Sequence, residues 1–549
     1  MLAFGFSSGL PFALLIGTLN AWLGEVGVNL ATIGVLSWIG LAYAFKFLWS
    51  PMVDRLPLPL LDRLGRRKSW IVLCQSLLIL GFGGLAMTNP AADIGTFALF
   101  AVLAALASAT QDIAVDAWRI DVADEQTSVE LLSSIYQFGY RTASIVGGAI
   151  ALVMAARMSW SLVYLIMAAL VVLLIFVTLT APDTKRPAVG ELHAGLNEKG
   201  ALNARARAVA LAIVGLSWLW AIVSIVRFMA SMLGEAAPGV PRPSVADFTK
   251  NIGPWIIFAT VFVPLIVAAT VNWLRSRGRA VLDAPESRSS PARTAMNHLY
   301  VALVAPLVEL TGRLGWAVLI TIGFILTYTL CYNIWSSFAF PFYLDFLHYS
   351  KDEVAFASKI FGIIMTILGI SLGGYLFIRI GRLPTILLGA ILPVFGNFIY
   401  ADLALGGANL DMVSHALALD RLLGLVGFDQ RMVRLLVAIC YENISTGLAG
   451  AAFVAYLSGI VSKRFTAVQY SLLSSLTFLI GSLGRGIAGE AFDTYGYALV
   501  FQWTAAAGLF AVLFVLLEWL RVSAVRRREA DLAPSVDDAG KAGAAEPAA

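Results

Sequence analysis

The chain has 549 residues, of which 59% are hydrophobic and only 13% are charged, and its mean hydropathy is +0.83. A typical soluble domain carries roughly 25% charged residues, so this composition excludes a water-soluble globule, a coiled coil and a disordered chain. The net charge of +4 is small for this length and argues against a nucleic-acid-binding protein, which needs clustered Lys and Arg.

Apolar runs long enough to cross a bilayer recur along the whole chain. A spanning helix needs about 20 mostly apolar residues. The candidate spans are residues 2–23, 31–52, 69–88, 95–118, 131–156, 159–181, 208–230, 252–274, 315–343, 354–379, 383–405, 432–461, 467–489 and 497–520. We therefore expect an all-α polytopic membrane protein with 14 transmembrane helices.

Basic residues in the connections predict the orientation. With the N-terminus in the cytoplasm, about 26 basic residues lie on the cytoplasmic side and about 7 on the outer side. The loop at 54–68 and the C-terminal tail carry many of them. We expect both termini in the cytoplasm and the chain in a bilayer.

Polar stretches divide the spans into groups. Six spans precede and six follow a connector that contains the pair at 208–230 and 252–274, and a second insertion at 406–430 lies on the outer side. A chain of six plus six spans is the plan of the major facilitator superfamily, whose halves rock about a midplane site. The predicted units are an N-terminal half (1–181), a connector with the inserted pair (182–314), a C-terminal half (315–521) and a disordered tail (522–549).

Charged residues inside the predicted spans are few. Each costs about 2.5 to 3.5 kcal/mol at a helix centre, so each is a candidate functional residue. They are Lys46, Asp112, Asp116, Arg119, Arg141, Arg227, Lys359, Glu442 and Arg485. We expect Arg227 either to extend toward the membrane surface or to face protein, and not to be catalytic.

Asp112, Asp116 and Arg119 are spaced four and three residues apart, which places them on one face of a helix. Asp116 and Arg119 favour a structural salt bridge near the cytoplasmic end. Asp112 lies a turn deeper, where pairing with Arg141 or Lys46 gives either a proton-coupling carboxylate or a purely structural ion pair. Both interpretations stay open.

In the second half, Glu442 and Asn443 lie in a helix that lines the central cavity of this architecture. Asn443 both donates and accepts hydrogen bonds, as a sugar hydroxyl or acetamido group requires. A structural pairing of Glu442 with Lys359 or Arg485 is equally compatible with the sequence. The four histidines have no metal-ligand spacing, so we expect no metal and no cofactor.

Several motifs resemble one family. Ser-Pro-Met-Val-Asp-Arg at 50–55, with Asp54 and Arg55, is completed by Gly65, Arg66, Arg67 and Lys68 and resembles the superfamily loop signature GxxxDRxGRR, interrupted by an insertion and with Ser50 in place of the first glycine. Further matching motifs are Gly-Phe-Ser-Ser-Gly-Leu-Pro at 5–11, Phe-Lys-Phe-Leu-Trp-Ser-Pro at 45–51, Gln-Asp-Ile-Ala-Val-Asp-Ala-Trp at 111–118, Gly-Tyr-Arg at 139–141, Tyr-Glu-Asn at 441–443 and residues 452–476. Together they look like the AmpG-type muropeptide permeases, over about residues 4–181 and 300–505.

The resemblance implies a proton-driven importer that carries N-acetylglucosaminyl-1,6-anhydro-N-acetylmuramic acid, with or without its stem peptide, from periplasm to cytoplasm for wall recycling. Family members also influence β-lactamase induction. Carried over by motif, Asp112 and Asp116 are expected to couple protons, with Lys46, Arg119 and Arg485 as charge partners. The expected substrate-binding residues are Gln111, Tyr140, Arg141, Lys359, Glu442 and Asn443.

One departure concerns the span at 315–343. The family often has a Lys and an acid close together there, whereas this chain offers only Tyr328, Cys331, Tyr332 and Asn333. An acetyl-CoA or other small-molecule carrier of the same superfamily is the alternative, and a polytopic membrane enzyme is a remote one. We expect a monomeric carrier without enzymatic activity.

Overall fold

The computed structural model describes residues 1–28, 36–55, 58, 61–124, 126–182, 200–233, 245–283, 290–333 and 338–532. Within these ranges the chain is built of helices, joined by turns and one isolated bridge between Leu202 and Val281, which confirms the all-α prediction. Eleven helices there are long and apolar enough to cross a membrane. A twelfth span is formed if the helices Ala305–Leu314 and Ala317–Tyr332, bent by 107°, count as one.

The N-terminal half is a bundle of helices with a core of apolar side chains. Trp22 stacks on Trp160 with ring centroids 5.9 Å apart, and Phe82 and Phe97 are fully buried beside them. Its elements are α1 (Leu2–Ala13), η1 (Leu14–Thr18), α2 (Leu19–Glu25), η2 (Ser37–Gly40), α4 (Leu41–Phe45), η3 (Lys46–Leu48), α5 (Ser50–Arg55), η4 (Asp62–Leu64), α6 (Arg66–Met87), α7 (Ile94–Asp121), α8 (Val129–Ser144), η5 (Ile145–Ile150), α9 (Ala151–Ala155) and α10 (Trp160–Thr180).

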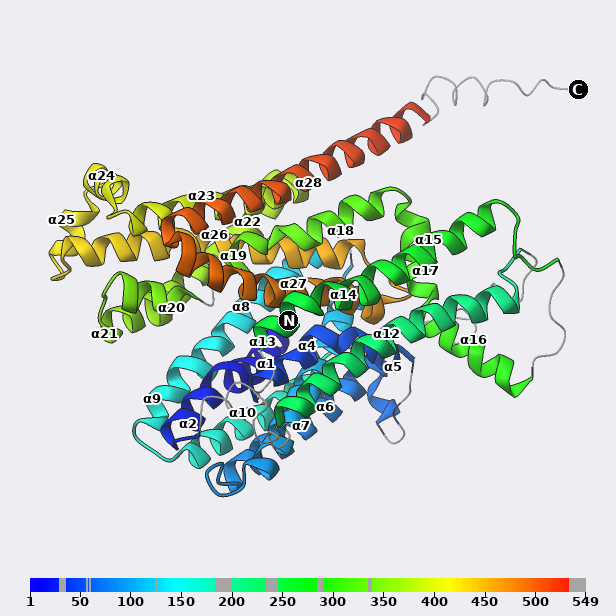
Figure 1. The fold of residues 1–549 in the computed structure, drawn as a ribbon, viewed down its shortest axis with the longest axis horizontal. Helices are drawn as coiled ribbons and strands as arrows, with labels where there is room; N and C mark the ends of the chain where they lie inside the picture. The colour runs from blue at the N-terminus through cyan, green and yellow to red at the C-terminus, as the bar shows by residue number, and fades with distance from the viewer. Residues whose placement is uncertain are drawn as a thin grey trace, which may run out of the picture.

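The C-terminal half forms a second bundle, above the first in Figure 1. Tyr328 stacks on Phe453 in its core, with ring centroids 5.4 Å apart. Its elements are α18 (Ala317–Tyr328), α19 (Leu330–Asn333), α20 (Ala339–Pro341), η8 (Phe342–Phe346), α21 (Lys351–Val354), η9 (Ala355–Phe361), α22 (Gly362–Ile380), α23 (Arg382–Ala404), α24 (Ala408–Ala416), α25 (Leu419–Gly424), α26 (Gln430–Ile460), α27 (Thr466–Tyr495) and α28 (Tyr497–Leu532).

Large apolar side chains remain exposed on the outer faces of the spans. Leu99, Phe176 and Leu216 are each more than 60% exposed, on three different helices. Lipid tails cover such surfaces in a membrane, where no water is available to make exposure costly.

The expected count of 14 spans is compatible with the structure and stays a prediction. The expected span at 31–52 coincides with the short elements η2 to α5, and residues 29–35 lie outside the described part of the chain. The expected span at 467–489 lies inside the single helix α27. The helix α28 continues to Leu532, past the predicted start of the disordered tail at residue 522.

The connector contains two long helical runs near the positions expected for the inserted pair, and they lie beside both halves. The pair consists of α12 (Ala204–Leu233) and the run of α14 (Gly253–Ile257), η6 (Phe258–Phe262) and α15 (Val263–Ser276), with α13 (Val245–Asn251), α16 (Pro291–Leu303) and α17 (Ala305–Leu314) around it. Trp218 of α12 meets Phe47 of the first half edge to face at 5.4 Å, and Leu472 of α27 belongs to the same core. Figure 1 shows α14 and α15 running along the boundary of the two bundles, while α12 crosses the view of the first bundle.

The insertion at 406–430 folds into α24 and α25 and is anchored to α26. Arg434 Nη2 lies 2.6 Å from Asp411 Oδ2. This hydrogen bond lowers the pKa of Asp411 to about 2, so the ion pair persists through the neutral range. The insertion is therefore tied to the span that also carries Glu442.

Candidate functional site

The helix α7 brings three charged side chains together with Lys46. Lys46 Nζ lies 3.5 Å from Asp116 Oδ2, and Arg119 Nη1 lies 3.1 Å from Asp116 Oδ1. The four side chains of Lys46, Asp112, Asp116 and Arg119, which we call the α7 cluster, are each at most 8% exposed. Two acids face two bases in this cluster, so the cost of burying each charge is offset by an opposite charge nearby.

Asp112 is in none of the described ion pairs of the α7 cluster, which join Asp116 to Lys46 and to Arg119. It interacts electrostatically with Lys46 and Asp116, while its Oδ1 atom accepts no hydrogen bond from the described residues. The expected contact with Arg141 is not among the described ion pairs, and the Arg141 Nε atom is buried without a hydrogen-bond partner there. Asp112 thus has an oxygen available for a proton, whereas Asp116 is bound by two cations.

Arg119 reaches from the first half to the second. Its Nη2 atom donates to Ser458 Oγ on α26 at 3.1 Å. Its guanidinium lies over the rings of Tyr136 and Tyr470, 4.7 and 5.2 Å from their centroids. The charge balance of the α7 cluster is therefore coupled to contact between the halves.

The motif loop forms a second network across the halves, centred on Arg67. Arg67 is fully buried, with Nη2 2.8 Å from Asp54 Oδ1 and Nε 3.0 Å from Asp121 Oδ2. Its Nη2 atom also donates to Thr466 Oγ1 of α27 at 2.6 Å, and Arg66 adds a 3.1 Å ion pair to Asp121. We call Asp54, Arg67, Asp121 and Thr466 the loop network. The end of the molecule at which this network lies is called the loop end.

Gly65 allows this geometry because it caps the start of α6, immediately before Arg66, with φ of +95° and ψ of 159°. Residues with a side chain rarely adopt this backbone conformation. Gly381 plays the same part in the second half, with φ of +84° before α23. The side chain of Arg55, the remaining motif residue, lies outside the description.

The second half holds a chain of hydroxyl groups that ends on a carboxylate. Tyr400 Oη of α23 donates to Glu442 Oε2 at 2.5 Å, and Tyr343 Oη of η8 lies 2.6 Å from Tyr400 Oη. Glu442 also borders a small cavity of about 10 Å³ with Tyr332 and Asn397, room for one water molecule. The expected alternative partners Lys359 and Arg485 have side chains outside the described part.

Two predicted binding residues, Asn443 and Gln111, use their amides within the protein. Asn443 Oδ1 accepts from Thr366 at 2.8 Å, and its Nδ2 donates to the Ile439 carbonyl at 2.9 Å. Gln111 is fully buried and donates to the Ser7 carbonyl of α1 at 2.8 Å. Tyr140 is half-buried, with its ring 6.1 Å from that of Phe12 and its hydroxyl in electrostatic contact with Asp112.

The sequence analysis missed Asp121, Thr466, Tyr400 and Tyr343. Asp121 lies three residues beyond the predicted span at 95–118 and was not singled out, although an acid two residues after Arg119 is a usable signal. The hydroxyl residues carry no sequence signal that separates them from ordinary helix positions. Over the described ranges, His, Cys, Asp and Glu form no group of three that could hold a metal ion.

Comparisons with known proteins place the fold. A family model described as Major Facilitator Superfamily matches residues 1–282, just over half of the chain. The structure resembles the proton:xylose symporter XylE bound to 6-bromo-6-deoxy-D-glucose, with a TM-score of 0.54 and 10% identity over 94% of this chain and 93% of that one. It also resembles an auto-inhibited POT family peptide transporter, with a TM-score of 0.54 and 14% identity over 94% and 95%.

Curated relatives match over nearly the whole length. The anhydromuropeptide permease of Escherichia coli (strain K12) is 26% identical over 537 residues, which cover 95% of this chain and 81% of that protein. The putative transporter AmpG 4 of Rickettsia conorii is 25% identical over 515 residues, 93% of this chain and 94% of that protein. The chain therefore belongs to the major facilitator superfamily and, within it, is similar to the AmpG-type permeases.

Proposed function

We propose that this protein imports anhydro-muropeptides, the disaccharide GlcNAc-1,6-anhydroMurNAc with or without its stem peptide, from periplasm to cytoplasm. The observation that carries the proposal is the similarity to the anhydromuropeptide permease over 95% of the chain. Buried charge within membrane spans supports a carrier, because such charge is retained where protons or substrates pass. The protein acts as a monomeric, non-enzymatic carrier in the bacterial inner membrane.

The loop end is the cytoplasmic end in this proposal, because the basic connections favour that side. Contacts between the halves gather there: Arg67 and Asp121 bind Thr466, and Lys463 Nζ donates to the Ala123 carbonyl at 3.3 Å. The structure then corresponds to a state that is closed toward the cytoplasm. Substrate enters from the periplasm, and breaking these contacts opens the inward path.

Asp112 carries the coupled proton in the proposed cycle. Protonation from the periplasm removes the negative charge of Asp112, so that Lys46 is attracted by Asp116 alone. The balance of charge around Arg119, which donates to Ser458, changes as a result. Because Arg119 contacts both halves, this change favours their separation at the loop end. Asp112 then releases its proton into the cytoplasm, where the pH is higher.

Substrate contacts are assigned to both halves around the centre of the bundle. Glu442, hydrogen-bonded to Tyr400, accepts from sugar hydroxyls, and the half-buried Tyr140 and Arg141 face the substrate from the first half. Asn443 and Gln111 fix α26 and α7 against their neighbours, so we assign them the positioning of the contact residues. Lys359 remains a proposed binding residue because of its position in the family pattern.

Uptake into vesicles tests the function. Inner-membrane vesicles that contain the protein are expected to accumulate labelled anhydro-disaccharide when an inward proton gradient is imposed, and to lose it when a protonophore collapses the gradient. Uptake that is independent of the gradient would contradict proton coupling. If the vesicles take up the disaccharide neither with nor without its stem peptide, the proposed substrate is wrong. Vesicles without the protein are the control.

The tyrosine that holds Glu442 gives a second prediction. Tyr400→Phe removes the 2.5 Å hydrogen bond to the carboxylate, so we expect KM for disaccharide uptake to rise about tenfold, corresponding to about 1.4 kcal/mol. Tyr441→Phe is the matched control, because its hydroxyl donates to the Leu392 carbonyl at 3.2 Å on the same pair of helices. Equal KM values for the two variants would argue against Glu442 as a substrate contact.

A further inference from the structure

A pocket of about 420 Å³ lies at the loop end, between the inserted helix pair and the second half. Its lining comes from α12 and the segment before it, from α15, α16 and α17, and from the segment that precedes α27. This volume is within the usual range of small-molecule sites, roughly 300 to 1,000 Å³. None of the residues of the proposed transport path lines it.

The pocket is strongly basic. Four arginines line it against one carboxylate, Glu309. Glu309 is already engaged, because Arg313 Nε binds its Oε1 at 2.9 Å and Gln469 Nε2 donates to its Oε2 at 2.6 Å. The lining arginines are Arg207, Arg275, Arg313 and Arg464.

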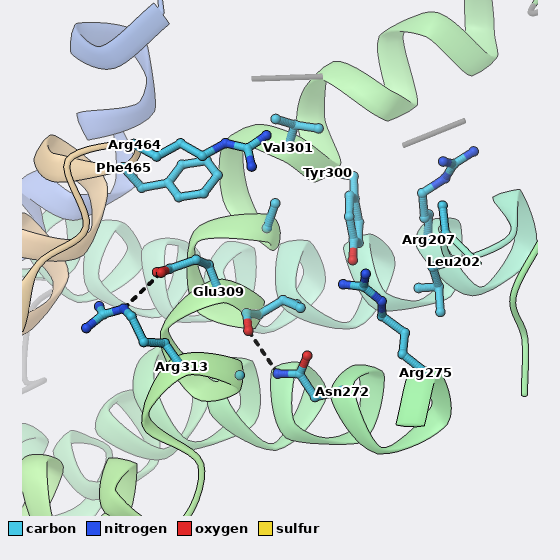
Figure 2. A pocket seen from close by; sticks show the side chains of 14 residues that line it. Leu202, Arg207, Asn272, Arg275, Tyr300, Val301, Glu309, Arg313, Arg464 and Phe465 are labelled. Carbon is cyan, nitrogen blue, oxygen red and sulfur yellow. Dashed lines mark hydrogen bonds and ion pairs between the residues drawn. The ribbon is translucent and has the colours of Figure 1, made fainter. Parts of the chain in front are cut away.

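The basic side chains occupy both walls. On one wall the fully buried Arg207 and the exposed Arg275 flank Tyr300, whose hydroxyl points toward the Arg275 guanidinium in Figure 2. On the other wall Arg464 lies beside Phe465, above the paired Arg313 and Glu309 (Figure 2). Guanidinium groups bind phosphate oxygens with paired N–H donors, and Tyr300 adds a neutral donor.

We infer that this pocket binds a phosphate-bearing anion. Four arginines around one cavity, against a single carboxylate that is already engaged, attract a multivalent oxyanion. The shared chemistry fits the headgroup of an anionic lipid of the adjacent leaflet and a soluble phosphate compound. Arg464 lies two residues before Thr466, so a ligand here sits next to the loop network.

Binding to the purified full-length protein tests the inference, with thermal unfolding as the readout and no transported substrate present. One arm titrates pyrophosphate into protein in nanodiscs of phosphatidylcholine. The other compares nanodiscs of phosphatidylglycerol and phosphatidylcholine without added phosphate. A saturable upward shift of the unfolding midpoint in the first arm identifies a soluble ligand, and a shift in the second identifies a lipid headgroup.

Arg275→Gln and Arg464→Gln are each expected to lower the affinity for the stabilising ligand about tenfold, because each removes a charged donor from one wall. Arg277→Gln is the matched control: Arg277 lies two residues beyond Arg275, outside the lining, over the Trp273 ring at 5.6 Å. No shift in either arm, or an equal loss in the Arg277 variant, would overturn the inference. Because the readout is binding alone, failed uptake of muropeptide leaves the result unaffected.

Discussion

Asp112→Asn is expected to abolish uphill accumulation of the anhydro-disaccharide while leaving downhill exchange in place. A gradient of one pH unit supplies about 1.4 kcal/mol per proton, enough for a tenfold concentration of substrate if one proton is coupled. Asparagine keeps the shape of the side chain but carries no proton. The variant should therefore reach equal concentrations inside and outside vesicles, measured with labelled disaccharide under an imposed gradient.

The matched control lies on the same helix. Asp93 caps the start of α7, where its carboxylate accepts from the Thr96 amide at 3.0 Å, and asparagine is an equally good cap. Asp93→Asn should therefore accumulate substrate as the unchanged protein does. Accumulation by the Asp112 variant at the unchanged level would assign Asp112 to a structural ion pair instead of proton transfer.

Arg67→Met is expected to cause the largest loss of stability of any single change in the motif loop. It leaves the buried carboxylates of Asp54 and Asp121 without their shared cation, and breaking a buried pair from one side costs about 3 to 5 kcal/mol. Thermal unfolding in detergent measures the loss. Arg63→Met in the same loop is the control, because Arg63 is exposed and such changes usually stay within about 0.5 kcal/mol.

Thr466→Val separates the contribution of the ion pairs within the loop network from that of its hydrogen bonds to the second half. It removes only the hydrogen bonds of the second half to Arg67 and Asp121, a loss of about 1 kcal/mol, and keeps both ion pairs. If Arg67→Met were no more destabilising than Thr466→Val, the ion pairs would contribute little and our account of the loop network would be wrong.

The fold class could be predicted from the sequence because a bilayer imposes a simple rule on composition. Spans need long apolar runs, and runs such as Trp160–Thr180 admit no other explanation. The weaker cases are those where the helix is broken. The expected span at 315–343 begins at the bend of 107° between the helices Ala305–Leu314 and Ala317–Tyr332, and no local signal at Gly315 reveals the angle.

The placement of the charged residues was only partly predictable. The spacing on α7 determines which side chains share a face of the helix. It does not determine which cation from another helix will pair with them. Asp116 binds Lys46 from a distant segment as well as Arg119, and Arg67 recruits Asp121 across the bundle. Tyr400 reaches Glu442 from a neighbouring helix and looks in the sequence like any core aromatic residue.

The inserted pair has a consequence for the mechanics of the proposed cycle. It packs on Phe47 of the first half and Leu472 of the second through one continuous apolar core. When the halves rock, that core cannot stay intact on both sides, so the pair must travel with one half and slide over the other. A superfamily member with this arrangement has an asymmetric hinge, and parting that one seam raises the energy barrier of the rocking step.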